Sequence, residues 1–125
     1  MEEQTTVNHD KLMALFGSVF NDVAGSVAIM MSYIGDQTGV YRAMDKLGPS
    51  SVASIAEEAK VDERYLKEWL ASNAARGYVH FNAESEEFSL TPEQAAVFLS
   101  SRNYNRRWAM LESIIKAFDN QLNQP

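Results

Sequence analysis

One stretch of the chain, SIAEEAKVDERYLKEWLASNAARGYVHF at residues 54–81, limits the possible folds more than any other. Apolar residues at helical spacing predict helices over 52–59 and 63–76. Only a short turn separates them, with Asp62 as the expected N-cap of the second helix and Gly77 as its stop. Two helices joined by so short a turn form a helix-turn-helix.

The residues after this pair predict a small hairpin and two more helices. Strand-forming runs at 78–81 and 87–90 enclose a polar loop. Thr91 is the expected N-cap of a helix that runs to Phe98 or Leu99, and a last helix is expected over about 103–122. The order predicts a mainly α fold: a winged helix-turn-helix with a short two-stranded hairpin, flanked by long N-terminal and C-terminal helices.

The N-terminal part of the chain predicts one long amphipathic helix that begins near His9 or Asp10, with Asp10 as its N-cap. Apolar residues then recur at spacings of three and four over 12–34. Two internal glycines, Gly17 and Gly25, predict a bend or a break near one of them.

Gly35-Asp36 predicts the end of that helix, and a second helix is expected over 37–47, before Gly48-Pro49. The whole chain of 125 residues is long enough for one domain with a modest core. We expect three parts within it: an N-terminal helical dimerisation region (1–34), the winged helix (35–100) and the C-terminal helix (101–125).

Composition excludes several classes of protein. The chain has no cysteine, which excludes disulfides and thiolate chemistry. Its acidic N-terminus lacks the basic segment of a signal peptide, and the longest nearly apolar run, 23–34, is too short to span a bilayer. His9 and His80 are too isolated to indicate a metal site. These features predict a cytoplasmic protein without a membrane partner.

The charge of the helix-turn-helix argues against nucleic acid as a partner. Residues 51–90 hold four basic and eight acidic residues, a net charge of −4. The loop of the hairpin carries Glu84, Glu86 and Glu87 and no cation, so it would be repelled by phosphates. The interpretation we favour is that the helix-turn-helix is a packing scaffold, although a stand-alone transcriptional regulator and an adaptor domain remain alternatives.

Four segments in order resemble the N-terminal winged-helix domain of S-adenosylmethionine-dependent small-molecule methyltransferases. They are IGDQTGVYRAMDKLG at 34–48, SIAEEAKVDERYLKEWL at 54–70, ARGYVHF at 75–81 and FSLTPEQAAVFL at 88–99. One departure is Lys60, which stands where such turns often have glycine.

The resemblance implies a domain that pairs two subunits and forms part of the wall or lid over a substrate site. It also implies that S-adenosylmethionine binds in a following Rossmann-like domain. The chain contains no G-x-G-x-x-G segment, so we expect no cofactor-binding, catalytic or metal-binding residue within it. A domain of a larger enzyme and a stand-alone homologue without the catalytic part both fit the sequence.

Two sets of residues follow as candidate sites. The long N-terminal stripe exceeds what a small winged helix can cover, which predicts a homodimer unless the last helix folds back over it. The expected interface residues are Leu12, Phe16, Phe20, Ala24, Val27, Ala28 and Met31.

A second set of residues is expected in the wall or lid over the substrate site, because it combines adaptable apolar side chains with arginines that oppose a helix dipole. Its expected residues are Met30, Tyr33, Ile34, Tyr104, Arg107 and Trp108.

Overall fold

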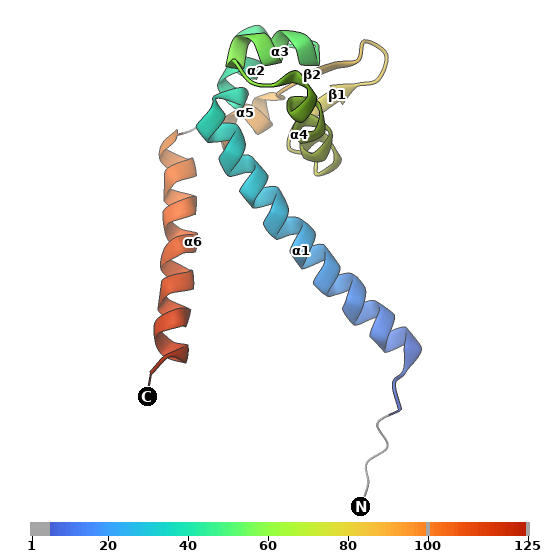
Figure 1. The fold of residues 1–125 in the computed structure, drawn as a ribbon, viewed down its shortest axis with the longest axis vertical. Helices are drawn as coiled ribbons and strands as arrows, with labels where there is room; N and C mark the ends of the chain where they lie inside the picture. The colour runs from blue at the N-terminus through green and yellow to red at the C-terminus, as the bar shows by residue number, and fades with distance from the viewer. Residues whose placement is uncertain (1–5, 100, 125) are drawn as a thin grey trace, which may run out of the picture.

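A computed structural model describes residues 6–99 and 101–124, and for residues 101–110 it describes the backbone alone. Six helices and one antiparallel hairpin make up this part of the chain, which confirms the expected winged helix-turn-helix with long flanking helices (Figure 1). The elements are α1 (His9–Thr38), α2 (Val40–Leu47), α3 (Val52–Ala59), α4 (Glu63–Ala75), β1 (His80–Asn82), β2 (Glu87–Ser89), α5 (Pro92–Phe98) and α6 (Ser101–Leu122).

Helix α1 begins where the sequence predicts, but its cap and its shape differ from the expectation. The N-cap is Asn8, whose side chain accepts a hydrogen bond from the Lys11 amide at 3.1 Å, so the assignment of Asp10 was wrong. The helix is also unbroken over 30 residues, without the expected bend at Gly17 or Gly25. Nothing lies within 4 Å of the Cβ position at Gly17, so no neighbour forces a kink there.

The expected end of this helix at Gly35-Asp36 was also wrong. Gly35 is buried in the middle of a helical turn, because the rings of Trp69 and Tyr41 pack directly against its Cα. The helix ends instead at Gly39, whose φ of 79° is one that glycine adopts without strain. The boundary expected between residues 34 and 35 therefore falls inside α1, and the last turn of this helix is part of the winged-helix core.

The helix-turn-helix follows the predicted pattern closely. The side chains of Ser51 and Asp62 cap α3 and α4 by accepting from backbone amides three residues later. Lys60 takes the left-handed conformation that the turn requires, with a φ of 58°. Gly77, with a φ of 77°, turns the chain after α4 towards the hairpin.

The hairpin and α5 complete the winged helix. The strands are shorter than predicted and pair in the register His80↔Ser89, Phe81↔Phe88, Asn82↔Glu87. Thr91 and Gln94 form a reciprocal capping box at the start of α5, in which each side chain accepts a hydrogen bond from the other residue's amide.

A series of hydrogen bonds links α1, α2 and α4 in the core. The Tyr41 hydroxyl donates to Asn73 Oδ1 at 2.9 Å, Asn73 Nδ2 donates to the Trp69 carbonyl at 3.0 Å, and Trp69 Nε1 donates to the Met31 carbonyl at 2.8 Å. Burial raises the pKa of Tyr41 to about 12, and the neighbouring Ser32 hydroxyl only partly offsets this. The largest fully buried side chains of the core are Tyr41, Met44, Ile55, Leu70 and Asn73.

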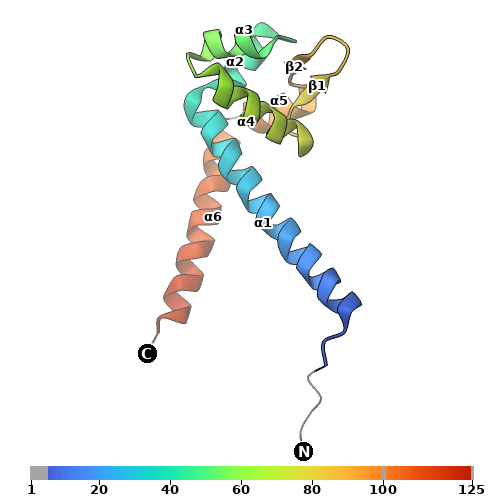
Figure 2. The same ribbon diagram turned by 45° about the vertical axis from the view of Figure 1, so that its right-hand side comes forward.

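Helices α1 and α6 extend away from this core and diverge from each other (Figures 1 and 2). Only the C-terminal end of α1 packs on the core, where it meets α2 and α4. The described apolar side chains of α6 remain exposed, so this helix does not fold back over α1. That observation removes one of the two outcomes that the sequence left open for the N-terminal stripe.

Candidate functional site

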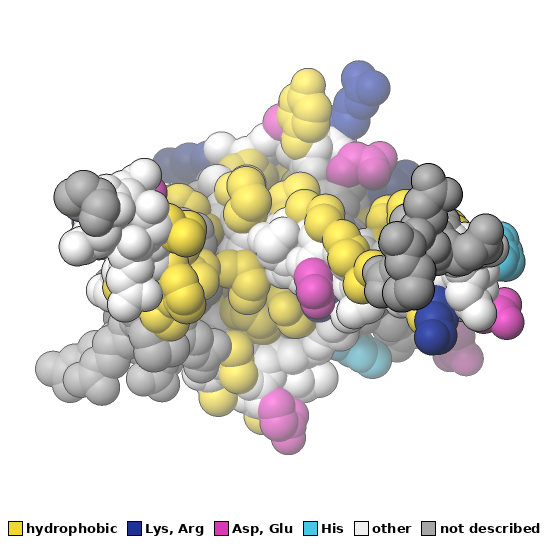
Figure 3. Space-filling view, turned by 90° about the horizontal axis from the view of Figure 1, so that it is seen from below, with side chains coloured by type: hydrophobic (Ala, Val, Ile, Leu, Met, Phe, Trp, Pro, Cys, Tyr) yellow, Lys and Arg dark blue, Asp and Glu magenta, His cyan; other side chains and the backbone are white. Residues whose placement is uncertain are grey.

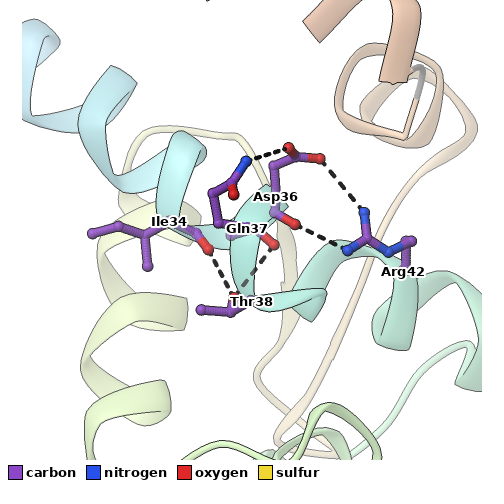
Figure 4. Close-up of polar contacts among 6 residues, drawn as sticks. Ile34, Asp36, Gln37, Thr38 and Arg42 are labelled. Carbon is purple, nitrogen blue, oxygen red and sulfur yellow. Dashed lines mark hydrogen bonds and ion pairs between the residues drawn. The ribbon is translucent and has the colours of Figure 1, made fainter. Parts of the chain in front are cut away.

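Polar contacts join the C-terminal end of α1 to the start of α2 (Figure 4). The Thr38 hydroxyl donates to the Ile34 carbonyl at 2.7 Å, which closes the last turn of α1. From α2, Arg42 Nη2 donates to the Asp36 carbonyl at 3.1 Å, and Nη1 lies 3.6 Å from the Asp36 carboxylate. The packing of Gly35 against the rings of Trp69 and Tyr41 joins this end of α1 to the core.

The side of α1 that faces away from the core is an open apolar surface, which we call the α1 stripe. At about 100° per residue its members lie within roughly 60° of one line along the helix. All of them are exposed; they are Leu12, Phe16, Val19, Phe20, Val23, Val27, Met30 and Ile34. An exposed apolar surface of this length is rare on a monomer and typical of an interface.

The structure divides the predicted interface residues between the two faces of α1. Four of them are exposed and belong to the α1 stripe: Leu12, Phe16, Phe20 and Val27. Ala24 and Met31 are half-buried at its edge. Ala28 is only 4% exposed and shares the inward face with Gly35, so its own chain already covers it.

Helix α6 carries a second open apolar surface. Its members recur at spacings of three and four, as on one face of a helix, and all are exposed: Leu111, Ile114, Ile115, Phe118 and Leu122. Figure 3, which views the molecule from below, shows hydrophobic side chains on the side of α6 that faces towards α1. Helices α1 and α6 therefore present apolar surfaces at the same end of the molecule.

Where α1 meets α4, the α1 stripe ends at an apolar pocket of about 340 Å³. Its lining includes Met31 and Ile34 from α1 and Tyr65 and Trp69 from α4. Of the residues predicted for a substrate wall, Ile34 lines this pocket, while Met30 and Tyr33 lie on the exposed surface of α1. The side chains of the other three, Tyr104, Arg107 and Trp108, lie outside the described residues.

The surface between α4 and the hairpin has the wrong charge for nucleic acid. A groove of about 620 Å³ there is lined by two carboxylates, from Glu63 and Glu86, and by one cation, Lys67. Two more carboxylates belong to the hairpin: Glu84 in its loop and Glu87 at the start of β2. Phosphates approaching this surface would meet net negative charge. A DNA-binding wing, in contrast, attracts phosphates with Lys and Arg.

By length and composition alone, α1 would also be able to cross a membrane. Its amphipathic character points to a different environment. Asp22 lies near the middle of the helix, where a carboxylate in lipid costs about 3 kcal/mol. Ser18 and Asn21 are exposed on the side opposite the α1 stripe, so that side suits water.

No group of three or more His, Asp or Glu side chains within the described ranges could hold a metal ion. Those residues also show no glycine-rich turn between a strand and a helix, the usual cradle for a nucleotide-like cofactor.

Helix-turn-helix, hairpin and capped α5 define a winged-helix domain. A family model described as the Rv2258c-like winged HTH domain matches residues 25–100, which is more than half of the chain. The chain belongs to this family. No curated protein sequence matches it.

Two methyltransferases of known structure share the fold. CalO1, a methyltransferase in calicheamicin biosynthesis with SAH bound, matches with a TM-score of 0.60 and 22% identity over 75% of this chain and 27% of CalO1. The S-adenosylmethionine-dependent methyltransferase SibL in its apo form matches with a TM-score of 0.56 and 19% identity over 86% of this chain and 30% of SibL. The chain thus spans less than a third of either protein.

A regulator is similar only loosely. BpsR of Bordetella bronchiseptica, whose DNA binding is regulated by 6-hydroxynicotinic acid, matches with a TM-score of 0.45 and 10% identity over the full length of both chains. This likeness is too weak to bear on function.

Proposed function

We propose that this chain is the non-catalytic N-terminal winged-helix domain of a cytoplasmic S-adenosylmethionine-dependent methyltransferase that acts on a small molecule. In this role it joins two subunits and contributes part of the wall over the substrate site. The observation that carries the proposal is the open α1 stripe on a winged helix of this family. The fold shared with CalO1 and SibL supports the link to methyl transfer.

The free energy available from the α1 stripe favours a dimer. Complete burial of a large apolar side chain contributes about 1.5–3 kcal/mol, so eight side chains that are about half exposed contribute roughly 1 kcal/mol each. Two copies together reach about 16 kcal/mol, against an association cost of about 4–15 kcal/mol. The apolar surface of α6 adds to the favourable side.

A matched pair of variants tests the dimer. Phe16→Glu places a carboxylate on the α1 stripe, whereas Ser18→Glu places the same group on the opposite, exposed side of the helix. Burying an unpaired carboxylate costs at least about 3 kcal/mol per dimer, or roughly 100-fold in dissociation constant. Light scattering after gel filtration should give a dimer for the unmodified chain and for Ser18→Glu, and a smaller mass for Phe16→Glu. A monomer for the unmodified chain at about 100 µM would contradict the proposal.

The proposed substrate wall consists of the residues around the apolar pocket, with Ile34 and Tyr65 at its open side. Methyl transfer to a small acceptor depends on positioning and on exclusion of water, and apolar walls provide both. We place S-adenosylmethionine and the catalytic residues in a separate domain of the same protein. This assignment is tested by Ile34→Asp in the complete enzyme, which should raise KM for the acceptor and leave the affinity for S-adenosylmethionine unchanged.

The second candidate is a transcriptional regulator, because the helix-turn-helix has the capped geometry of a DNA-reading module. The acidic groove between α4 and the hairpin disfavours it. Fluorescence anisotropy with duplex DNA at physiological salt distinguishes the two. Sequence-selective binding tighter than about 1 µM would establish the regulator instead.

A further inference from the structure

The outer edge of the hairpin carries a backbone donor and a backbone acceptor that no described residue satisfies. Strand β2 lies between β1 on one side and Ser50 on the other. The Phe88 amide donates to the Ser50 carbonyl at 2.8 Å, and the Phe88 carbonyl accepts from the Ser50 amide at 3.0 Å. Both groups of Phe88 therefore point away from β1, so Phe88 and its cross-strand partner Phe81 share no backbone hydrogen bond. The N–H and C=O of Phe81 consequently point outwards, at the free edge of β1.

The side chain at this edge lies in the groove between α4 and the hairpin. Phe81 is 42% exposed, and its ring centroid is 4.7 Å from that of Phe88, which lines the same groove. Residues directly opposite each other on neighbouring strands have their side chains on the same face of the sheet. A residue that paired with Phe81 from a further strand would therefore direct its side chain to the groove, where Val52 and Ala71 add apolar surface.

The charge of the groove selects the chemistry of such a strand. Glu63 and Glu86 line the groove, and neither forms an ion pair with any residue that the structure describes. Lys67 is the one cation among the described lining residues. Side chains two positions before and after the residue opposite Phe81 also lie on the groove face, because strand side chains alternate. Lys or Arg at these two positions would meet the carboxylates of the groove.

We propose that the free edge of β1 binds an extended basic segment of a partner protein as an added strand. The segment has an apolar residue opposite Phe81 and Lys or Arg two positions to either side of it. Backbone hydrogen bonds supply affinity, and the groove supplies selectivity. Strand β1 contains neither Lys nor Pro, residues that often protect an edge from pairing. No residue of α1 lines this groove, so the proposal does not depend on the α1 stripe or on the proposed dimer.

The probe is a fluorescein-labelled peptide of sequence TRTVTRT, which reads the same in both directions and so suits either strand direction. One comparison peptide carries Glu in place of both Arg residues, and another has a methyl group on the backbone nitrogen of Val, which removes the donor to Phe81. The protein variant is Glu63→Gln/Glu86→Gln. Its matched control is Glu57→Gln/Glu93→Gln, which removes two exposed carboxylates outside the groove.

Fluorescence anisotropy should show saturable binding of TRTVTRT with a dissociation constant of about 100 µM. Glu63→Gln/Glu86→Gln should weaken it about fivefold to tenfold, because two exposed ion pairs are lost, and the control should leave it unchanged. Both comparison peptides should bind about tenfold more weakly or less. In nuclear magnetic resonance spectra of the protein, the Phe81 amide should shift on titration, and its exchange with solvent should slow.

Three results would overturn the proposal. Absence of saturable binding would remove the site. Equal binding of the methylated peptide, or of the peptide with Glu, would exclude the added strand or its selectivity for basic segments. Shifts confined to α1, with the Phe81 amide unaffected, would show that the peptide binds the α1 stripe instead.

Discussion

Gly35→Ala tests how α1 is attached to the winged helix. In an exposed helix, replacement of glycine by alanine stabilises by about 1 kcal/mol. At Gly35, however, the new Cβ would lie 2.6 Å from Tyr41 Cε2 and closer still to the Trp69 ring, where ordinary contact begins at 3.4 Å. Both rings are buried, so neither can move away freely.

Overpacking of this kind costs about 1–3 kcal/mol or more, which outweighs the gain in helix propensity. We expect a net loss of about 2 kcal/mol in the free energy of unfolding, or roughly 8 °C in Tm for a chain of this length. Urea unfolding at one fixed protein concentration measures it, because association would couple to stability.

The matched controls are Gly17→Ala, whose Cβ meets nothing within 4 Å, and Gly25→Ala, whose Cβ meets only the end of the Arg76 side chain at 3.4 Å. Both should gain stability by up to about 1 kcal/mol. A Gly35→Ala variant as stable as these controls would refute the packing of α1 against Trp69.

Two further predictions concern single sites, and a third concerns the cofactor. The raised pKa of Tyr41 stabilises the fold fully below pH 10, and this contribution is lost as the pH rises through about 12, so urea midpoints should fall between these values. In Tyr41→Phe the fall should be smaller. Lys60→Gly should stabilise by about 1 kcal/mol in thermal melts, because Lys60 occupies a left-handed conformation, and a loss would refute that strain. Titration calorimetry with S-adenosylmethionine should show no binding, and saturable micromolar binding would contradict our placement of the cofactor in another domain.

The parts of the fold that the sequence predicted correctly are those that local chemistry determines. Asp62 and Thr91 each cap a helix where their side chains reach an amide three residues on, and Gly77 follows α4 as expected. These signals act over a few residues, so one sequence is enough to identify them.

The features that the sequence analysis missed depend on contacts between distant residues. In the sequence, Gly35 is typical of a helix end. It nevertheless lies within α1, because the ring of Trp69, 34 positions later, occupies the space that a side chain at this position would fill. The hydrogen bond from Tyr41 to Asn73 joins residues 32 apart and has no local signature. Similarly, periodicity identified the apolar stripe but not which edge the core covers, and this is why Ala28 was assigned to the open side.

The central claim is that this domain serves an S-adenosylmethionine-dependent methyltransferase, and the most direct measurement is the nucleotide sequence of its gene beyond codon 125. We predict that the reading frame continues into a strand, a glycine-rich turn and a helix, the arrangement that binds the cofactor in Rossmann-like domains. A stop codon there, or a continuation into a domain without that turn, would contradict the account.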